Sequence, residues 1–307
     1  KGQNVMARSS SPDSVTGFVN LSKPAGMTSS DAVCIVRGVL SRTIGGRQKT
    51  GHLGTPDPLA TGVLPIALGK ATALFDFLAF KTKRYVAEFT FGTATDTLDR
   101  GGKTVRDGGR IPSAEEIAAV LARFTGEFMQ TPPAYSAKSV NGRRAYSYAR
   151  SGEAVELAPK TVRVDSFELI SGGEGVYEFA IECGGGTYIR SLARDVAEAL
   201  GTCAYMSALT RTKSGPFTPP NTVTPGEIRL APEKHIIPAE FALSGLKKVA
   251  LDENSLKRVL NGIPVAAADV AEGEYAAVYD AHGTLAGLGL RAARGLVIKV
   301  RLQDGKQ

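Results

Sequence analysis

The chain has 307 residues, of which 43% are hydrophobic and 22% charged, enough for one large domain plus a small one, or for two of moderate size. Its formal net charge of +7, with an isoelectric point near 9.3, favours a nucleic-acid partner without proving one. A membrane-spanning helix is excluded, because no apolar run approaches the roughly 20 residues that a bilayer requires.

The three cysteines, Cys34, Cys183 and Cys203, are odd in number and far apart. They form no C-x-x-C pair, so their spacing supports neither a zinc site nor a disulfide framework. We interpret them as buried, reduced thiols of a cytoplasmic protein.

The chain begins with a polar, Ser-rich segment, residues 1–14, which we expect to be disordered and not a signal peptide. Residues 17–23 then predict a strand that ends at Pro24. Thr28, Ser29 and Ser30 offer N-caps for a helix over about residues 31–40.

The stretch Lys49–Gly62 holds three glycines, two prolines, a histidine and one acid, and we predict a fixed loop. Asp57 stands between Pro56 and Pro58, which restrict the backbone and hold the carboxylate out. The alternative is a simple proline-rich turn capped by an acid. The apolar run of residues 63–72 is expected to enter a helix.

Period-2 alternation predicts a half-buried strand over residues 84–91. The next stretch, Thr95–Gly102, places acids near glycines, but their spacing does not match a calcium loop and we predict no metal there. Ser113 and Glu116 form a capping box that opens a helix extending to Phe124.

The segment Gln130–Arg150 carries no acidic residue and interleaves cations with tyrosines. Cations contact phosphates and aromatic rings stack on bases, so this composition suits an RNA-contacting insertion. A solvated basic face is the alternative. Asn141-Gly142 is typical of a tight turn, which predicts a projecting hairpin.

Residues 176–183 alternate as a strand that leads through three glycines into a helix stopped at Gly201. Thr187 is a candidate N-cap, which would place Arg190 in the first turn. An arginine there opposes the helix dipole unless an acid answers it, so Arg190 either faces a carboxylate or is simply exposed. Neither a dinucleotide fingerprint nor a P-loop is complete in the chain, so NAD and ATP are not supported.

From Leu246 the pattern changes to a short helix near residues 255–260. Strands are expected at residues 275–279, 284–290 and 296–302, separated by Gly283 and Gly295. This arrangement predicts a small β-rich module at the end of the sequence.

Taken together, these motifs closely resemble the TruB-type tRNA pseudouridine synthases. The matching segments follow the family order and are Gly17–Ser29 with its Lys23-Pro24-x-Gly26 core, Gly51–Thr72, Lys83-Arg84-Tyr85, Thr95–Asp99, Pro132–Arg150 and Gly186–Arg190. One position departs from the pattern, since Pro56 stands where the family usually carries leucine. The tail resembles a PUA-type RNA-binding domain more loosely.

The resemblance implies an α+β fold: a catalytic domain with a mixed, mostly antiparallel sheet and a projecting RNA-binding insertion, followed by a small β-rich domain. The expected boundaries are residues 15–240 for the catalytic domain, about 130–155 for the insertion and 246–307 for the PUA-like domain. The implied reaction isomerises a uridine of the tRNA T-loop, at position 55, to pseudouridine without a cofactor. We expect a monomer that binds the T-stem-loop.

The resemblance also assigns roles: Asp57 as the catalytic aspartate, Tyr85 as the ring stacked on the target base and Arg190 as the partner of Asp57. The expected substrate-binding residues are His52, Tyr188, Leu209, Lys23, Lys138, Arg143 and Arg144.

Two other functions stay open at this point. A non-catalytic RNA-binding or tRNA-folding protein could use the same basic segment, although it has no reason to keep Asp57, Tyr85 and Arg190 together. A glycosidase would need a second acid as proton donor. Asp96 or Asp99 could be nominated, but no sequence feature supports either.

Overall fold

The computed structural model describes residues 15–46, 48–79, 81–136, 139–140, 143–144, 148 and 157–303. The predicted disordered segment 1–14, the predicted turn at Asn141-Gly142 and Lys138 lie outside these residues.

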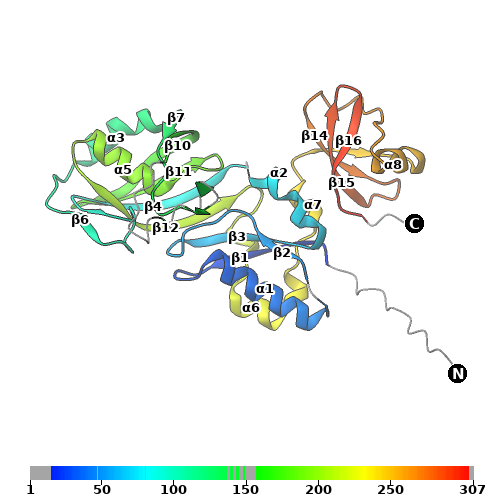
Figure 1. Ribbon diagram of the computed structural model, residues 1–307, viewed down its shortest axis with the longest axis horizontal. Coiled ribbons are helices and arrows are strands. Elements are labelled where there is room, and N and C mark those ends of the chain that lie inside the picture. Colours follow the sequence, from blue (N-terminus) through cyan, green and yellow to red (C-terminus); the bar gives the residue numbers. More distant parts are fainter. Residues whose placement is uncertain are drawn as a thin grey trace.

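An eight-stranded sheet forms the centre of the molecule, with the order β1-β3-β12-β4-β11-β10-β7 and β2 added beside β3 (Figure 1). Its strands are β1 (Gly17–Lys23), β2 (Thr50–His52), β3 (Thr61–Leu68), β4 (Lys83–Phe91), β7 (Gly126–Gln130), β10 (Lys160–Gly173), β11 (Val176–Cys183) and β12 (Ala204–Ser214). All its neighbours pair antiparallel except β3 and β12, which run parallel and meet over only two residue pairs, Thr61 with Thr210 and Gly62 with Arg211.

Helices pack separately on the two halves of this sheet, and the last helix packs on a separate C-terminal sheet. They are α1 (Ser29–Thr43), α2 (Phe75–Ala79), α3 (Ala114–Leu121), α5 (Ile189–Ala199), α6 (Pro225–Leu230), α7 (Ala239–Ala242) and α8 (Glu253–Leu260). Helices α3 and α5 pack on the half containing β4, β10 and β12, while α1 and α6 pack on β1 and its neighbours. Short 3₁₀ helices occupy Gly69–Leu74, Ala122–Phe124, Pro219–Asn221 and Pro232–His235.

Two small hairpins lie outside the large sheet. They pair β5 (Ala94–Thr95) with β6 (Thr104–Arg106), and β8 (Ser139–Val140) with β9 (Arg143–Arg144). The second pair confirms antiparallel strands on either side of the predicted turn.

A separate four-stranded sheet ends the chain, as the sequence predicted (Figure 1). Its strands are β13 (Lys247–Ala250), β14 (Tyr275–Tyr279), β15 (Leu285–Ala292) and β16 (Gly295–Arg301). No strand was predicted at β13, which pairs parallel with β14. Leu74 and Leu78 share one buried cluster with Leu285 and Leu288, so this sheet packs firmly against the preceding part of the chain.

These observations confirm the predicted mixed, mostly antiparallel α+β fold. Strands β1, β11 and β14 have the predicted bounds, and the capping box of Ser113 and Glu116 opens α3. The expectation that the apolar run of residues 63–72 enters a helix was wrong for its first part. Residues 61–68 form β3, which is buried on both faces, and an unbroken apolar run is compatible with either structure.

The thiols differ from the expectation at one position: Cys183 and Cys203 are buried, but Cys34 is exposed on α1. In the described part of the chain, no helix combines the length and the apolar character needed to cross a membrane.

Gly62 is required where β3 meets β12. Its φ is +92°, and a methyl group added there would lie 2.4 Å from the carbonyl oxygen of Arg211. We expect Gly62→Ala to lower the free energy of unfolding by at least about 2 kcal/mol, because strained backbone and overpacking add. Denaturant unfolding measures the change.

Gly51→Ala is the matched control, since an added methyl group there meets no atom within 4 Å. Its effect should stay within about 0.5 kcal/mol. Equal stabilities of the two variants would contradict the close contact at Gly62.

Candidate active site

A pocket opens where the loop after β2 meets strands β4 and β12 and the start of α5. Its walls include residues 54–57 of that loop, together with Tyr85, Tyr188 and Leu209. Four cationic side chains also line it, against a single acid, Asp57; they are Lys83, Lys160, Arg190 and Arg211. The pocket is therefore suited to a negatively charged ligand with an apolar or aromatic part.

The Asp57 loop, residues 53–60, is held in one conformation. Gly54 adopts a φ of +86°, which favours glycine, and Pro56 is buried against the pocket. The carbonyl of Pro58 accepts hydrogen bonds from the Gly26 amide at 2.9 Å and from Lys23 Nζ at 2.9 Å. The loop predicted over residues 49–62 is confirmed only for residues 53–60, because Thr50–His52 form β2 and β3 begins at Thr61.

Lys23 is the internal anchor of this loop. Its side chain is 1% exposed, and its ammonium donates to the carbonyls of Pro24, Met27 and Pro58 at 3.0, 2.6 and 2.9 Å. Burial lowers the pKa of Lys23 to about 8; the Asp57 carboxylate opposes this shift and Arg211 adds to it. All three ammonium hydrogens therefore already have backbone acceptors.

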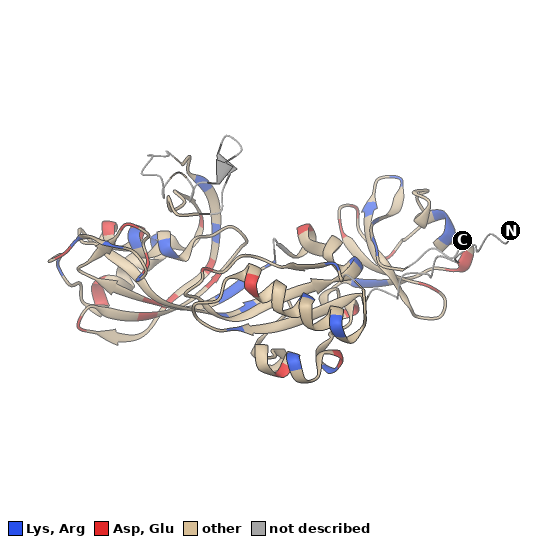
Figure 2. Cartoon of the chain, turned by 60° about the horizontal axis from the view of Figure 1, so that its bottom comes forward, with Lys and Arg blue, Asp and Glu red and all other residues tan. Residues whose placement is uncertain are grey.

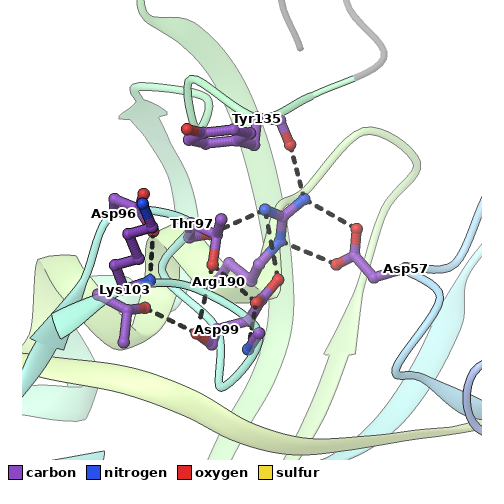
Figure 3. A network of polar contacts seen from close by, with 9 residues as sticks. Asp57, Asp96, Thr97, Asp99, Lys103, Tyr135 and Arg190 are labelled. Atoms are coloured by element: carbon purple, nitrogen blue, oxygen red, sulfur yellow. Dashed lines mark hydrogen bonds and ion pairs between the residues drawn. The ribbon is translucent and has the colours of Figure 1, made fainter. Parts of the chain in front are cut away.

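Asp57 and Arg190 form a two-point ion pair (Figure 3). Arg190 Nε donates to Asp57 Oδ2 at 2.9 Å, and Nη2 donates to Oδ1 at 2.8 Å. Arg190 is 6% exposed, whereas 27% of the Asp57 side chain remains open. This parallel geometry is among the stronger polar contacts in proteins and fixes the direction of the carboxylate.

The remaining donors of Arg190 are also used. Nη1 donates to the carbonyl of Thr97 at 2.9 Å, and Nη2 donates to the carbonyl of Tyr135 at 3.0 Å. Asp99 Oδ2 lies 3.6 Å from Nη1 as a second acid. The guanidinium is thus fixed from several segments of the chain.

The loop of residues 95–102 has the role of holding Arg190. Asp99 Oδ1 accepts from Thr97 Oγ1 at 2.7 Å and from the Gly101 amide at 2.9 Å, while Leu98 takes a φ of +61°. These contacts orient the Thr97 carbonyl and the Asp99 carboxylate towards Arg190. Among the described residues, no group of three metal-ligating side chains exists here or elsewhere.

Arg190 occupies the first turn of α5, as the sequence predicted. The N-cap is Tyr188 and not Thr187, and it makes no side-chain capping bond. The alternative that the sequence left open, an exposed arginine, is wrong. Asp57 and Asp99 supply the negative charge that a cation needs at the positive end of a helix.

The charge state of Asp57 is set by two opposing effects. Burial raises the pKa of its carboxyl above the usual range, while the charge and hydrogen bonds of Arg190 pull this pKa back down. Arg190 is therefore the main group that favours the ionised carboxylate in this pocket.

Three further side chains that line the pocket are apolar or aromatic. Tyr85 on β4 is half-buried, and burial raises the pKa of its hydroxyl to about 12, so the phenol is neutral near pH 7. Leu209 on β12 is buried and stands in register with Ala87. Tyr188 adds a second aromatic ring to the lining of the pocket.

Tyr188 is itself held from both sides. Gln130 exchanges two hydrogen bonds with its backbone, at 2.9 and 3.1 Å, and Lys160 Nζ lies 4.7 Å from the centre of its ring. Neither Gln130 nor Lys160 was predicted. Their distance from Tyr188 in sequence leaves no local pattern by which to find them.

Comparisons with known proteins decide the family. The model described as "TruB family pseudouridylate synthase (N terminal domain)" matches residues 42–189, and "tRNA pseudouridylate synthase B C-terminal domain" matches residues 190–244. A relative from Caldanaerobacter subterraneus subsp. tengcongensis, named "tRNA pseudouridine synthase B", is 40% identical over 280 residues, 90% of this chain and 95% of its own. The chain belongs to the TruB family of pseudouridine synthases. It is therefore an isomerase.

Another TruB relative, from Caulobacter sp., is 39% identical over 84% of this chain and 83% of its own. A solved structure described as "H/ACA RNP bound to a substrate RNA containing 2'-deoxyuridine" matches with a TM-score of 0.71 and 25% identity. The match covers 94% of this chain and 85% of that one. These similarities support the architecture over nearly the whole chain.

The other residues expected to contact substrate in this TruB chain occupy different positions. His52 does not line the pocket; its Nδ1 lies 2.9 Å from the carbonyl of Gly54, and burial lowers its pKa. A carbonyl only accepts, so Nδ1 carries the hydrogen and Nε2 is left as the acceptor. Lys138 lies outside the described residues, and of Arg143 and Arg144 only the backbone is described. Their roles stay predictions.

The contacts of Lys23 generate a test of its role. We expect Lys23→Met to lower the free energy of unfolding by about 2 kcal/mol or more, because buried carbonyls lose their donor. The Gly26 amide, bonded to Pro58, should also exchange its hydrogen faster. Denaturant unfolding and hydrogen exchange measure these effects.

Lys49→Met, at an exposed lysine after α1, is the control and should change neither quantity. If Lys23→Met lowers RNA affinity and leaves stability and exchange intact, the predicted substrate contact is correct and the anchoring role is wrong.

Proposed function

We propose that this enzyme converts the uridine at position 55, in the T-loop of tRNA, to pseudouridine, with Asp57 as the catalytic group acting on a flipped-out nucleotide. The observation that carries this proposal is the Asp57 carboxyl group, held by the two-point contact with Arg190 in a pocket that Tyr85 and Leu209 also line. The curated relatives named "tRNA pseudouridine synthase B" support tRNA as the substrate.

The charge of the pocket and of the surface supports an RNA substrate. The pocket wall carries four cations and one acid, and Figure 2 shows Lys and Arg, interspersed with Asp and Glu, along the whole molecule, including the C-terminal sheet. Over the full sequence the cations are in excess, with a net charge of +7. Phosphates are the natural partners of such a surface. We propose that the basic hairpin around β8 and β9 and the C-terminal sheet supply further tRNA contacts.

Flipping explains how Asp57 reaches its target. A uridine stacked in an RNA loop shields its sugar and ring, so the nucleotide must leave the stack at a cost of a few kcal/mol. Stacking on Tyr85 offsets about 1–3 kcal/mol of that cost. The half-buried ring at the pocket wall is suited to this contact.

The chemistry needs an ionised carboxylate in either of two routes. In one route Asp57 attacks C1′ of the ribose, and in the other it removes a proton from the sugar. Both routes break the bond from C1′ to N1 of the base and later join C1′ to C5. The rearrangement changes no overall oxidation state, so the reaction requires neither a redox cofactor nor phosphoryl energy.

The pocket must also retain the base while it turns. Free uracil has to present C5 in place of N1 without diffusing away. Leu209 and Tyr188 close the pocket beside the acid, and Gln130 and Lys160 hold Tyr188 there. Rigid walls of this kind keep the detached base close enough to react again.

The predicted domain boundaries, the monomeric state and the cytoplasmic location stay predictions. The C-terminal sheet shares a buried cluster with residues before it, so a role in tRNA binding is better tested by surface substitutions than by deletion.

The first test uses an unmodified tRNA transcript, with pseudouridine mapped at single-nucleotide resolution. We expect wild-type protein to modify position 55. Asp57→Asn should yield no detectable product, because the amide can neither attack nor accept the proton, while the affinity for tRNA stays within a few-fold.

Asp107→Asn is the control: its carboxylate accepts from Thr93 Oγ1 on the surface, and wild-type turnover is expected. Product formation by Asp57→Asn would remove Asp57 from the mechanism, and a product at another position would overturn the assigned specificity.

The second prediction concerns pH. Turnover requires ionised Asp57, so the rate should fall as pH drops through the pKa of this carboxyl, which burial raises above the usual range. Arg190→Lys keeps a charge but loses the two-point contact, so the pKa of Asp57 should rise. We expect the midpoint of the acid limb to move up by about one pH unit.

Single-turnover rates over a pH series measure the shift. Arg84→Lys is the control, because Arg84 pairs with Glu182 on the surface. An acid limb that stays in place in Arg190→Lys would show that the ionisation of Asp57 does not set the pH dependence.

A further inference from the structure

Arg211 on β12 is a buried arginine without a carboxylate partner among the described residues. Arg211 is only 2% exposed, and its Nε donates a hydrogen bond to the carbonyl of Val63 at 2.7 Å. Nη2 is fully buried and makes no hydrogen bond. The ion pairs of the described chain involve other arginines and lysines.

Strand register places Arg211 next to Tyr85, which also lines the pocket. It stands opposite Tyr85 on β4 and opposite Gly62 on β3, so its guanidinium and the Tyr85 side chain are cross-strand neighbours. Nη1 lies 3.1 Å from the position where Gly54 would carry a Cβ atom, at the base of the Asp57 loop. Arg211 also lines the pocket itself.

The surrounding groups experience its charge. Burial is the main reason why the pKa values of Lys23 and Lys83 fall to about 8, and the charge of Arg211 lowers both further. The same charge contributes to the lowered pKa of His52. A positive field therefore extends across the floor of the pocket.

Such an arrangement is costly for the fold. A buried charge without a counter-ion is strongly destabilising, and proteins keep such groups chiefly where a site uses them. Arg190 is neutralised by Asp57 and Asp99, whereas Arg211 is not. Its charge is thus available to a negative charge that exists only during the reaction.

We propose that Arg211, together with Tyr85, stabilises the negative charge that develops on the uracil ring when its glycosidic bond breaks. This inference rests on the proposed function. The electron pair of the C1′–N1 bond stays on N1 and spreads over the ring and its two carbonyl oxygens. On the sugar, the Asp57 carboxylate compensates for the electron pair that C1′ loses, because Asp57 either bonds to C1′ or takes a proton from C2′.

The later steps return that charge. When C5 of the ring forms its bond to C1′, the electron pair of the ring makes the new bond. At the same stage the bond from Asp57 to C1′ breaks or, in the other route, the proton held by Asp57 returns to C2′, so the carboxylate is regenerated. The hydrogen on C5 is then lost, and N1 gains one, so the atoms of uridine and pseudouridine are the same. A cation whose attraction is greatest for the negatively charged, detached base lowers the free energy of the transition state more than that of the bound substrate.

The test compares two leaving groups. Arg211→Met and Arg211→Lys are assayed in single turnover on T-stem-loop RNA carrying uridine or 5-fluorouridine at the target position. Loss of the N1-linked nucleoside is followed by nuclease digestion and mass spectrometry. Fluorine stabilises the uracil anion by itself, so the fluorinated base depends less on a protein cation.

We expect Arg211→Met to slow bond breaking with uridine by about 10²–10³-fold, as for removal of one charge-stabilising donor. The loss with 5-fluorouridine should be at least about tenfold smaller, and Arg211→Lys should recover at least about tenfold of the uridine rate. RNA affinity should change by less than about threefold.

Arg194→Met is the matched control, because Arg194 lies on α5 away from the pocket and pairs with Asp195. It should leave both rates unchanged. Equal losses on the two substrates, or a wild-type rate in Arg211→Met, would overturn the inference.

Thermal unfolding is measured for each variant. If Arg211→Met does not fold, the comparison rests on Arg211→Lys, whose smaller loss must still be greater with uridine than with 5-fluorouridine. Failure of the wild-type protein to modify either RNA refutes the proposed function instead, so the two failures are distinguishable.

Discussion

The two-point contact between Asp57 and Arg190 is the interaction on which the site depends. One guanidinium joins the Asp57 loop, the loop of residues 95–102 and the carbonyl of Tyr135. It directs the carboxylate and lowers the pKa that burial raises. Arg190 thus both orients Asp57 and favours its ionised form. Its own donors are occupied by Asp57 and by the carbonyls of Thr97 and Tyr135.

Arg190 and Arg211 show two uses of the same side chain within one pocket. The charge of Arg190 is neutralised by Asp57 and Asp99, and Arg190 fixes Asp57 before any ligand binds. Arg211 has a backbone carbonyl and a phenol as neighbours and leaves the floor of the pocket positive. A second carboxylate beside Arg211 would relieve the cost of its burial and remove that field.

The sequence predicted local features well and long-range ones poorly. Alternation identified β4 and β11, the glycine spacing of the tail identified β14, and the dipole argument offered a facing acid as one of two interpretations of Arg190. The helix expected over residues 63–72 is in fact mostly β3, because an unbroken apolar run does not distinguish a buried strand from a helix. Lys160, Gln130 and Arg211 were missed as site residues, since only the pairing of distant strands brings them to the pocket.

The short parallel seam between β3 and β12 has a consequence for folding. Hairpins such as β10–β11 close over short connections, whereas the Asp57–Arg190 bond spans 133 residues and the Thr61–Thr210 contact spans 149. Closing long loops costs more entropy, so contacts of this range form slowly. Each half of the sheet has its own helices and buried cluster and can become ordered first. Until the seam closes, the chain has an acid in one half and an arginine in the other, but no active site.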